Sequence, residues 1–287
     1  MKKGVASDGS SSRERRPPKP SLARYARELL PALQRMLLSA SDARSMLKHP
    51  RLIPPTEPRT CDWASVPMSV DEIKAAAGTY TVNDVLMAAL SLSIGRLAAE
   101  RKSPFPDEPR AVMWVSLRPL AEAAYTAAER PIPFGAADMG SAFLALPTNV
   151  VDARAALDAV RQRVADLIVS PEPLVSNLIL RVFGFLPPAV LRVVWRLAAF
   201  KVTLSASNMR LPAGEIKWGN RALHELAFMV PAQGSVATFV CLVTINNRLT
   251  VSMNCGKHIL PQDAVTKFAH VHYLAALRDV MATAKAS

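Results

Sequence analysis

The sequence predicts an α/β protein in which a mixed β-sheet is flanked by helices. Segments with the alternation or apolar content of strands are interspersed with segments of helical spacing. Their order does not follow the strict strand–helix–strand rhythm of a parallel sheet, and residues 235–254 read as an antiparallel hairpin. Half of the 287 residues are hydrophobic, which is enough for a substantial core.

The first 60 residues differ in composition from the rest of the chain. Residues 1–20 are polar, rich in Ser and Arg and without an apolar run, which predicts a disordered basic leader and not a secretory signal. Within 21–60 we expect an amphipathic helix over 21–47, interrupted or restarted at Pro31, and then a Pro-rich linker. The remaining residues, 61–283, form the predicted folded domain.

Apolar spacing and turn residues predict the elements of that domain. Expected strands cover 61–68, 110–117, 137–147, 201–208, 222–230 and the two arms of the hairpin 235–254, whose turn is Asn246-Asn247. Expected helices cover 70–77, 82–101, 151–169, two pieces of 174–200, and 261–282. A surface loop is expected over 120–133.

The helix that begins at Val82 has an unusual start. Thr81 is placed as its N-cap, and Asp84 three residues later can complete a capping box. Asn83 lies between them, and the helix that follows is nearly all apolar, so we expect it to be buried. A polar pair at the head of a buried helix is either a cap or part of a site, and both interpretations stay open here.

Residues 174–200 are the most apolar part of the chain. Pro187-Pro188 divides them into two helical pieces, each shorter than the roughly 20 residues that span a bilayer. Arg181, Arg192 and Arg196 interrupt the apolar face. Two amphipathic helices that lie on the protein core or on a membrane surface fit this pattern.

Charge and cysteine content exclude several classes of protein. The formal charge is +12, and residues 1–60 hold 13 Lys/Arg against 5 Asp/Glu. Such a leader can meet nucleic acid, anionic lipid or nothing specific, but no nucleic-acid motif accompanies it and aromatic residues are scarce, so no nucleic-acid partner is expected. Cys61, Cys241 and Cys255 are too few and too dispersed for a disulfide framework or a metal site, which predicts buried reduced thiols.

Four segments, taken in order, carry a family resemblance. They are TVNDVLMAAL from residue 81, VSLRP at 115–119, MGSAFLALP at 139–147 and TLSASN at 203–208. Together they resemble the C-terminal half of the wax ester synthase/diacylglycerol acyltransferase family, over roughly residues 21–283. The resemblance implies the fold of CoA-dependent acyltransferases such as chloramphenicol acetyltransferase, in which two similar α/β halves enclose the active site in a tunnel.

The resemblance also implies an activity. Enzymes of this family are O-acyltransferases that move a fatty acyl group from acyl-CoA to a long-chain alcohol or to diacylglycerol, giving wax esters or triacylglycerol. Acyl-CoA is then a co-substrate and the lipid acceptor a second partner, with no permanently bound cofactor. The family's general base is the second His of a His-His-x-x-x-Asp-Gly motif in the N-terminal half.

That motif does not occur in this sequence, whose histidines are His49, His224, His258, His270 and His272. His270 and His272 are two residues apart and would point to different faces of a helix. We therefore expect no catalytic residue here, and expect an acceptor-side half whose missing partner is the base-carrying N-terminal half. The alternative is a catalytically inactive lipid- or partner-binding module of the same fold.

The resemblance marks five candidate residues for a substrate tunnel or an oxyanion hole: Asn83, Asp84, Ser205, Ser207 and Asn208. Strand alternation places Ser205 and Ser207 on one face of the sheet and Asn208 on the other. The structural alternatives are helix capping for Asn83 and Asp84, and polar residues at a strand end for the other three. Ser116 and Arg118 of VSLRP are expected to end a strand at a buried salt bridge.

The same features predict a location. Residues 174–200 and the basic helix 21–47 suggest peripheral association with an anionic membrane surface. The expected site is the endoplasmic reticulum or plasma membrane in a eukaryote, and otherwise the cytoplasm.

Overall fold

A computed structural model describes residues 22–43, 45–48, 58–103, 105–117, 139–211, 216–230 and 236–286. The predictions for the leader 1–20, for nearly all of the Pro-rich linker, for the loop 120–133 and for Arg118 lie outside these residues. The division of the chain at residues 20 and 60 stays a prediction.

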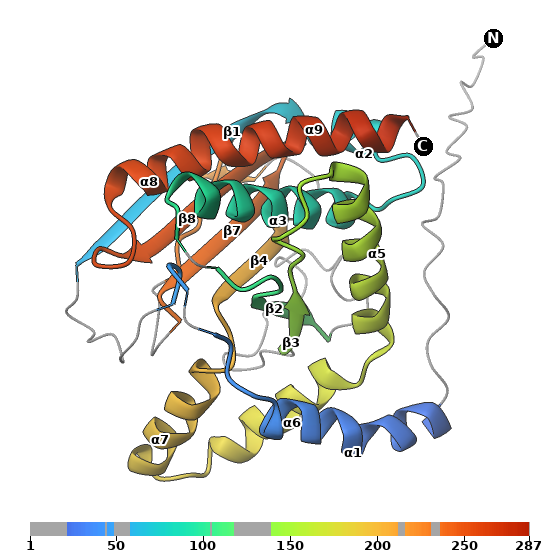
Figure 1. The fold of residues 1–287 in the computed structure, drawn as a ribbon, viewed down its shortest axis with the longest axis vertical. Helices are drawn as coiled ribbons and strands as arrows, with labels where there is room; N and C mark the ends of the chain where they lie inside the picture. Colours follow the sequence, from blue (N-terminus) through green and yellow to red (C-terminus); the bar gives the residue numbers. More distant parts are fainter. Residues whose placement is uncertain are drawn as a thin grey trace.

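The centre of the fold is a six-stranded mixed sheet, as predicted (Figure 1). Its strands, in spatial order, are β1 (Arg59–Ser69), β8 (Arg248–Gly256), β7 (Thr238–Ile245), β4 (Leu204–Arg210), β2 (Arg110–Ser116) and β3 (Met139–Ala145). The inner strands β7, β4 and β2 are mutually parallel, and the outer pairings are antiparallel. The β7–β8 hairpin turns at Asn246 and Asn247, whose φ values of 47° and 65° are the left-handed ones expected of such a turn.

The helices form two groups. One group covers a face of the sheet: α2 (Val70–Ala76), α3 (Val82–Glu100), α5 (Ala153–Val169), α8 (Gln262–Lys267) and α9 (Tyr273–Lys285). The other group lies at one end of the molecule, below the sheet in Figure 1: α1 (Leu22–Leu38), α6 (Glu172–Phe183) and α7 (Pro188–Ala199). The two helices predicted from residues 174–200 are thus α6 and α7.

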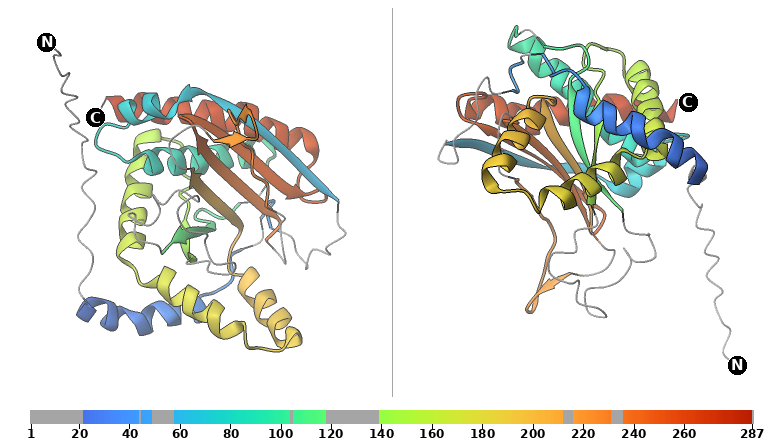
Figure 2. Two further views of the ribbon diagram at one scale, coloured as in Figure 1. Left: turned by 180° about the vertical axis from the view of Figure 1, so that it is seen from behind. Right: turned by 90° about the horizontal axis from the view of Figure 1, so that it is seen from below.

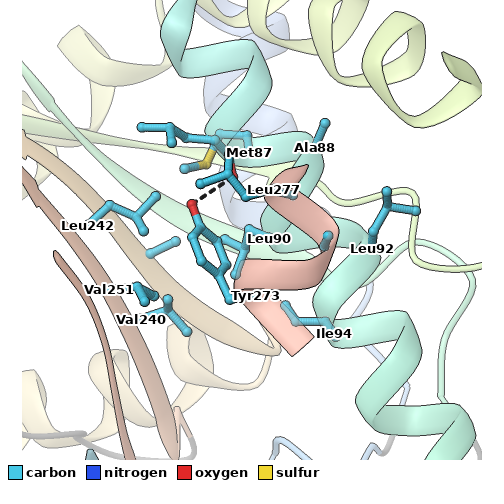
Figure 3. Close-up of a cluster of buried hydrophobic side chains, with 14 of the residues drawn as sticks. Met87, Ala88, Leu90, Leu92, Ile94, Val240, Leu242, Val251, Tyr273 and Leu277 are labelled. Atoms are coloured by element: carbon cyan, nitrogen blue, oxygen red, sulfur yellow. Dashed lines mark hydrogen bonds between the residues drawn. The ribbon is translucent and has the colours of Figure 1, made fainter. Parts of the chain in front are cut away.

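The core lies between the sheet and the α3–α9 pair, and Figure 3 shows its centre. Tyr273 is fully buried there, and its hydroxyl donates to the carbonyl oxygen of Leu86 over 3.4 Å. Burial raises the pKa of this phenol. Among the described residues α3 alone is long and apolar enough to cross a membrane, but it is mostly buried in this core.

Helix α1 differs from the prediction in two respects. It runs through Pro31 without interruption and ends at Leu38, not at residue 47. Pro31 is exposed, so water can serve the carbonyl that lacks a partner. The early end follows from Asp42, whose carboxylate accepts from Arg110 Nε at 2.6 Å and from Thr203 Oγ1 at 2.8 Å and so holds the chain against the sheet.

The strand predicted at 222–230 is also wrong, apart from its first residue. Arg221–Ala222 (β6) pairs with Lys217–Trp218 (β5), and residues 223–230 make no strand ladder. Alternate side chains of β8 hold them instead: Thr250, Ser252 and Asn254 donate to the carbonyl oxygens of residues 226, 228 and 230. An extended segment therefore follows β8 on the sheet face opposite α3, held by side-chain bonds that backbone patterns do not predict.

The last predicted helix forms, but it is not uniform. A π-helical turn, Phe268–His272, separates α8 from α9. His270 Nε2 lies 3.7 Å from Asp62 and His272 Nε2 lies 2.9 Å from Glu100, so the two histidines do point to different partners, as predicted.

Candidate functional site

The start of α3 is capped as the sequence predicts. Thr81 Oγ1 accepts from the Asp84 backbone N–H at 3.1 Å, and Asp84 Oδ2 accepts from the Thr81 N–H at 2.9 Å. This reciprocal pair is a capping box, and Asp84 is almost fully buried. The capping interpretation of Asp84 is therefore confirmed, and its carboxylate is committed to the helix end.

Asn83 makes a different contact. Its Oδ1 accepts from Asn208 Nδ2 at 3.0 Å, across 125 residues of sequence. Both side chains are partly buried. The hydrogen bond joins the TVND segment to the TLSASN segment, so two of the four segments that carry the resemblance meet at one point of the fold.

Ser205 lies on the other face of β4. Leu204 and Ala206 pack into the core beneath α3, and Asn208 continues that face. Ser205 is buried on the opposite face, where its Oγ accepts from Trp114 Nε1 at 3.2 Å. The predicted split between Ser205 and Asn208 is confirmed, so the candidates fall into two sets separated by the sheet.

Each set includes a residue of the central parallel strand β4. The VSLRP segment begins in β2, which ends at Ser116, and Asn208 lies two residues before the end of β4. Because β2 and β4 are parallel, their carboxyl ends lie at the same edge of the sheet, and the N-terminus of α3 reaches that edge through Asn83. Open α/β sheets bind ligands at the carboxyl ends of their parallel strands. Ser205 lies further back, as the second residue of β4, where it contacts Trp114. We call Asn83, Asn208 and Ser207, together with this Trp114–Ser205 pair, the carboxyl-edge cluster.

Trp114 was not predicted as a member of this cluster. Its indole N–H can only donate, so Ser205 Oγ acts as acceptor and keeps its own hydrogen for another acceptor. Period-two alternation from Ser116 back along β2 places Trp114 on the same face as Ser116, which is the signal that sequence reasoning had available.

The described histidines with a charged partner lie far from the cluster. His272 contacts Glu100, the last residue of α3, whereas Asn83 is near its first turn. At 1.5 Å per residue the two ends of α3 are roughly 25 Å apart. Among the described residues, no group of three or more His, Cys, Asp or Glu side chains is placed to hold a metal ion.

A surface hollow of about 380 Å³ lies elsewhere, between β3, α5 and α1. It is lined by charged and apolar side chains, among them Arg163, Asp166 and Phe143. No member of the carboxyl-edge cluster lines it.

The comparisons with known proteins agree with the resemblance. The family model of the WS/DGAT C-terminal domain matches residues 137–285. None of the curated protein sequences compared with the chain matches it.

Several solved structures share the fold. The wax ester synthase/diacylglycerol acyltransferase from Marinobacter aquaeolei VT8 is 16% identical with a TM-score of 0.55, and the match covers 92% of this chain and 58% of that one. The epimerization domain from the third module of tyrocidine synthetase B is 12% identical with a TM-score of 0.58, over 92% and 57%. The starter condensation domain of rhizomide synthetase, solved with C8-CoA, is 12% identical with a TM-score of 0.52, over 91% and 53%.

At these identities the likeness concerns the fold, which is that of condensation-domain and CoA-dependent acyltransferase proteins. The chain spans little more than half the length of the structures it matches.

Proposed function

Because this chain belongs to the WS/DGAT C-terminal domain family, we propose that it forms the C-terminal half of an acyl-CoA-dependent O-acyltransferase. The reaction passes a fatty acyl group from the CoA thioester to the hydroxyl of diacylglycerol or of a long-chain alcohol. The acceptor oxygen attacks the thioester carbonyl and loses its proton to a general base, and the C–S bond breaks to release CoA. The products are triacylglycerol or a wax ester.

The observation that carries this proposal is the hydrogen bond between Asn83 and Asn208. It brings two separate family segments together at the carboxyl edge of β4, beside the end of the VSLRP strand. Neither amide is required for the cap of α3, which Thr81 and Asp84 complete. A positioning role for the two amides at a substrate site accounts for this arrangement.

The hydroxyl of Ser205 has a second role in this proposal. Trp114 occupies one lone pair of Ser205 Oγ and leaves the hydroxyl hydrogen available. A preorganised donor of this kind stabilises the oxyanion that develops on a thioester carbonyl, with an effect on the order of 3 kcal/mol. Ser207, on the same face and closer to the strand end, is the second hydroxyl of this set.

The general base comes, in this proposal, from a partner half with the His-His-x-x-x-Asp-Gly motif, which the sequence does not contain.

An assay of acyl transfer from palmitoyl-CoA to hexadecanol and to dioleoylglycerol tests this division between two halves. We expect no turnover from the purified chain alone, and turnover when it is expressed together with an N-terminal half that carries the His-His-x-x-x-Asp-Gly motif, here called the motif-bearing segment. The Asn208→Ala variant should lower that turnover, and Val151→Ser, at an exposed side chain outside the cluster, should leave it unchanged. Turnover by the chain alone would refute the division of labour.

A second candidate is a non-catalytic lipid- or partner-binding module. The observation that favours it is that His272 contacts the Glu100 end of α3, roughly 25 Å along the helix from Asn83. The two candidates separate in the same assay. A module binds acyl-CoA or a partner but stays inactive in the presence of the motif-bearing segment.

We further propose that the protein works at a membrane surface. Diacylglycerol, long-chain alcohols and their esters partition into bilayers, so an enzyme that uses them meets its acceptor there.

A further inference from the structure

Exposed apolar side chains gather on α6 and on the turn that follows it. Leu174, Leu178 and Val182 are more than half exposed, and Phe185 is 90% exposed. Residues three and four positions apart lie on one side of a helix, so Leu174, Leu178 and Val182 form a single stripe, and Phe185 follows in the turn after α6. The stripe ends in an aromatic ring at the tip between α6 and α7.

The opposite side of α6 is fixed to the sheet. Ser176 Oγ accepts from the Ser141 N–H of the edge strand β3 at 2.6 Å, and Asn177 Nδ2 donates to the Met139 carbonyl at 2.8 Å. These contacts bury one side of α6 and point the apolar stripe away from the protein. The stripe is therefore a consequence of how α6 is anchored.

Helices α7 and α1 extend the same surface. Val190 and Val193 of α7 are exposed, as are the α1 residues Leu29, Leu30 and Leu38. The end of α7 is tied to the end of α1 by Lys201, whose Nζ donates to the Met36 carbonyl at 2.9 Å. The left view of Figure 2 shows the three helices together at one end of the molecule, and the right view shows them side by side from below. We call the exposed apolar residues of α1, α6 and α7, with Phe185, the basal surface.

Beyond Glu172, the first residue of α6, the charged residues of α6 and α7 are all basic. Residues 173–214 contain five Lys/Arg and no Asp or Glu. Arg181 and Arg192 are exposed beside the apolar stripe. An apolar surface with cations complements an anionic bilayer, in which acyl chains lie beneath negatively charged headgroups.

We propose that the basal surface docks on an anionic lipid bilayer, with α6 and α7 in the interfacial plane and Phe185 among the acyl chains. Each helix has 12 residues and is roughly 18 Å long, which is too short to span a hydrocarbon core of about 30 Å. This inference rests on the proposed membrane location and names the surface that meets the bilayer. It is tested independently of acyl transfer, because binding to vesicles requires neither acyl-CoA nor a general base. It can fail while acyl transfer succeeds, and the reverse.

Vesicle flotation with the full chain tests it. We expect the chain to float with vesicles of phosphatidylcholine and phosphatidylglycerol. Its binding to vesicles of phosphatidylcholine alone should be weaker by about tenfold or more. Salt at about 0.5 M should weaken binding to the anionic vesicles. The double variant Leu178→Ser, Phe185→Ser should lower the partition coefficient by about tenfold or more. Arg192→Glu should lower binding to anionic vesicles alone.

Val151→Ser is the matched control. Val151 is also 90% exposed, but it precedes α5 at the end of that helix remote from α6. The control should bind as the original chain does, and circular dichroism should show all variants folded. The proposal is overturned if the chain floats with neither kind of vesicle, or if the double variant binds vesicles undiminished. If the double variant binds vesicles undiminished and no longer binds the motif-bearing segment, the basal surface is a subunit interface instead.

Discussion

The two amides of the carboxyl-edge cluster depend on each other. Asn83 lies in the first turn of α3 and Asn208 lies on β4. Among the described contacts, one hydrogen bond joins the two side chains. A neutral hydrogen bond of this kind contributes about 1 kcal/mol to the free energy of unfolding.

A double-mutant cycle measures that contribution. Asn83→Ala and Asn208→Ala should show a coupling of about 1 kcal/mol in urea unfolding. The control is the cycle of Asn83→Ala with Ser207→Ala, because Ser207 neighbours Asn208 but lies on the other face of the sheet. That cycle should be additive within about 0.5 kcal/mol. Equal coupling in both cycles would show that the amide pair is not a specific contact.

The three cysteine thiols differ in burial and therefore in reactivity. Burial raises the pKa of Cys241 and of Cys255 to about 11 each, whereas Cys61 is exposed. The sequence prediction of buried thiols is thus right for two cysteines and wrong for Cys61, since strand alternation turns Cys61 to the open face of the edge strand β1.

Thiolate is the reactive form, and at pH 8 a thiol of pKa about 11 is ionised in about one molecule in a thousand. In the folded protein one thiol should therefore react quickly with an aromatic disulfide reagent, and in urea all three should react. Cys61→Ser should remove the fast phase. Three fast thiols in the folded chain would contradict the described burial.

At the scale of elements, the contact between β3 and α6 is unusually close. A Cβ added at Gly140 would lie 2.0 Å from the carbonyl oxygen of Pro173, so only glycine allows this approach. The glycine of the MGSAFLALP segment thus has a packing reason. It lets Ser176 and Asn177 of α6 form hydrogen bonds with backbone groups of the edge strand β3.

Gly140→Ala should therefore lower the free energy of unfolding by about 1–3 kcal/mol, because backbone and not a flexible side chain has to move. Gly184→Ala is the control, since its nearest neighbour would be at 3.2 Å, and its effect should be smaller. Denaturant unfolding of the two variants gives the comparison. A Gly140→Ala variant as stable as the original chain would mean that β3 and α6 are not in this contact.

The elements also show where sequence reasoning succeeds and where it fails. The caps at Ser69 and Thr81 and the turn at Asn246-Asn247 were predictable because local chemistry determines them. The end of α1 was not, since it follows from the contact of Asp42 with Arg110, 68 residues away. The segment 223–230 was mistaken for a strand because its partners are side chains of β8.

At the scale of the whole molecule, the mixed sheet could be predicted from the alternation of strand and helix patterns and from the antiparallel hairpin. The family could be predicted because four short segments occur in the right order. The pairing of Asn83 with Asn208 could not, because it depends on the order β7–β4–β2 in space. Trp114 was missed for the same reason, as its partner Ser205 is 91 residues away. The sequence identified the candidate residues by their type and by the family segments. The sheet topology then shows which of them meet on each face of the sheet.

The central claim is that acyl-CoA meets this chain at the carboxyl-edge cluster. Photolabelling with a palmitoyl-CoA that carries a diazirine in its acyl chain, followed by peptide mapping, tests it most directly. We predict labels near the start of α3 and the end of β4, displaced by excess palmitoyl-CoA and reduced in the Asn83→Ala, Asn208→Ala double variant. Displaceable labels confined to the hollow beside α5 or to the basal surface would contradict the claim.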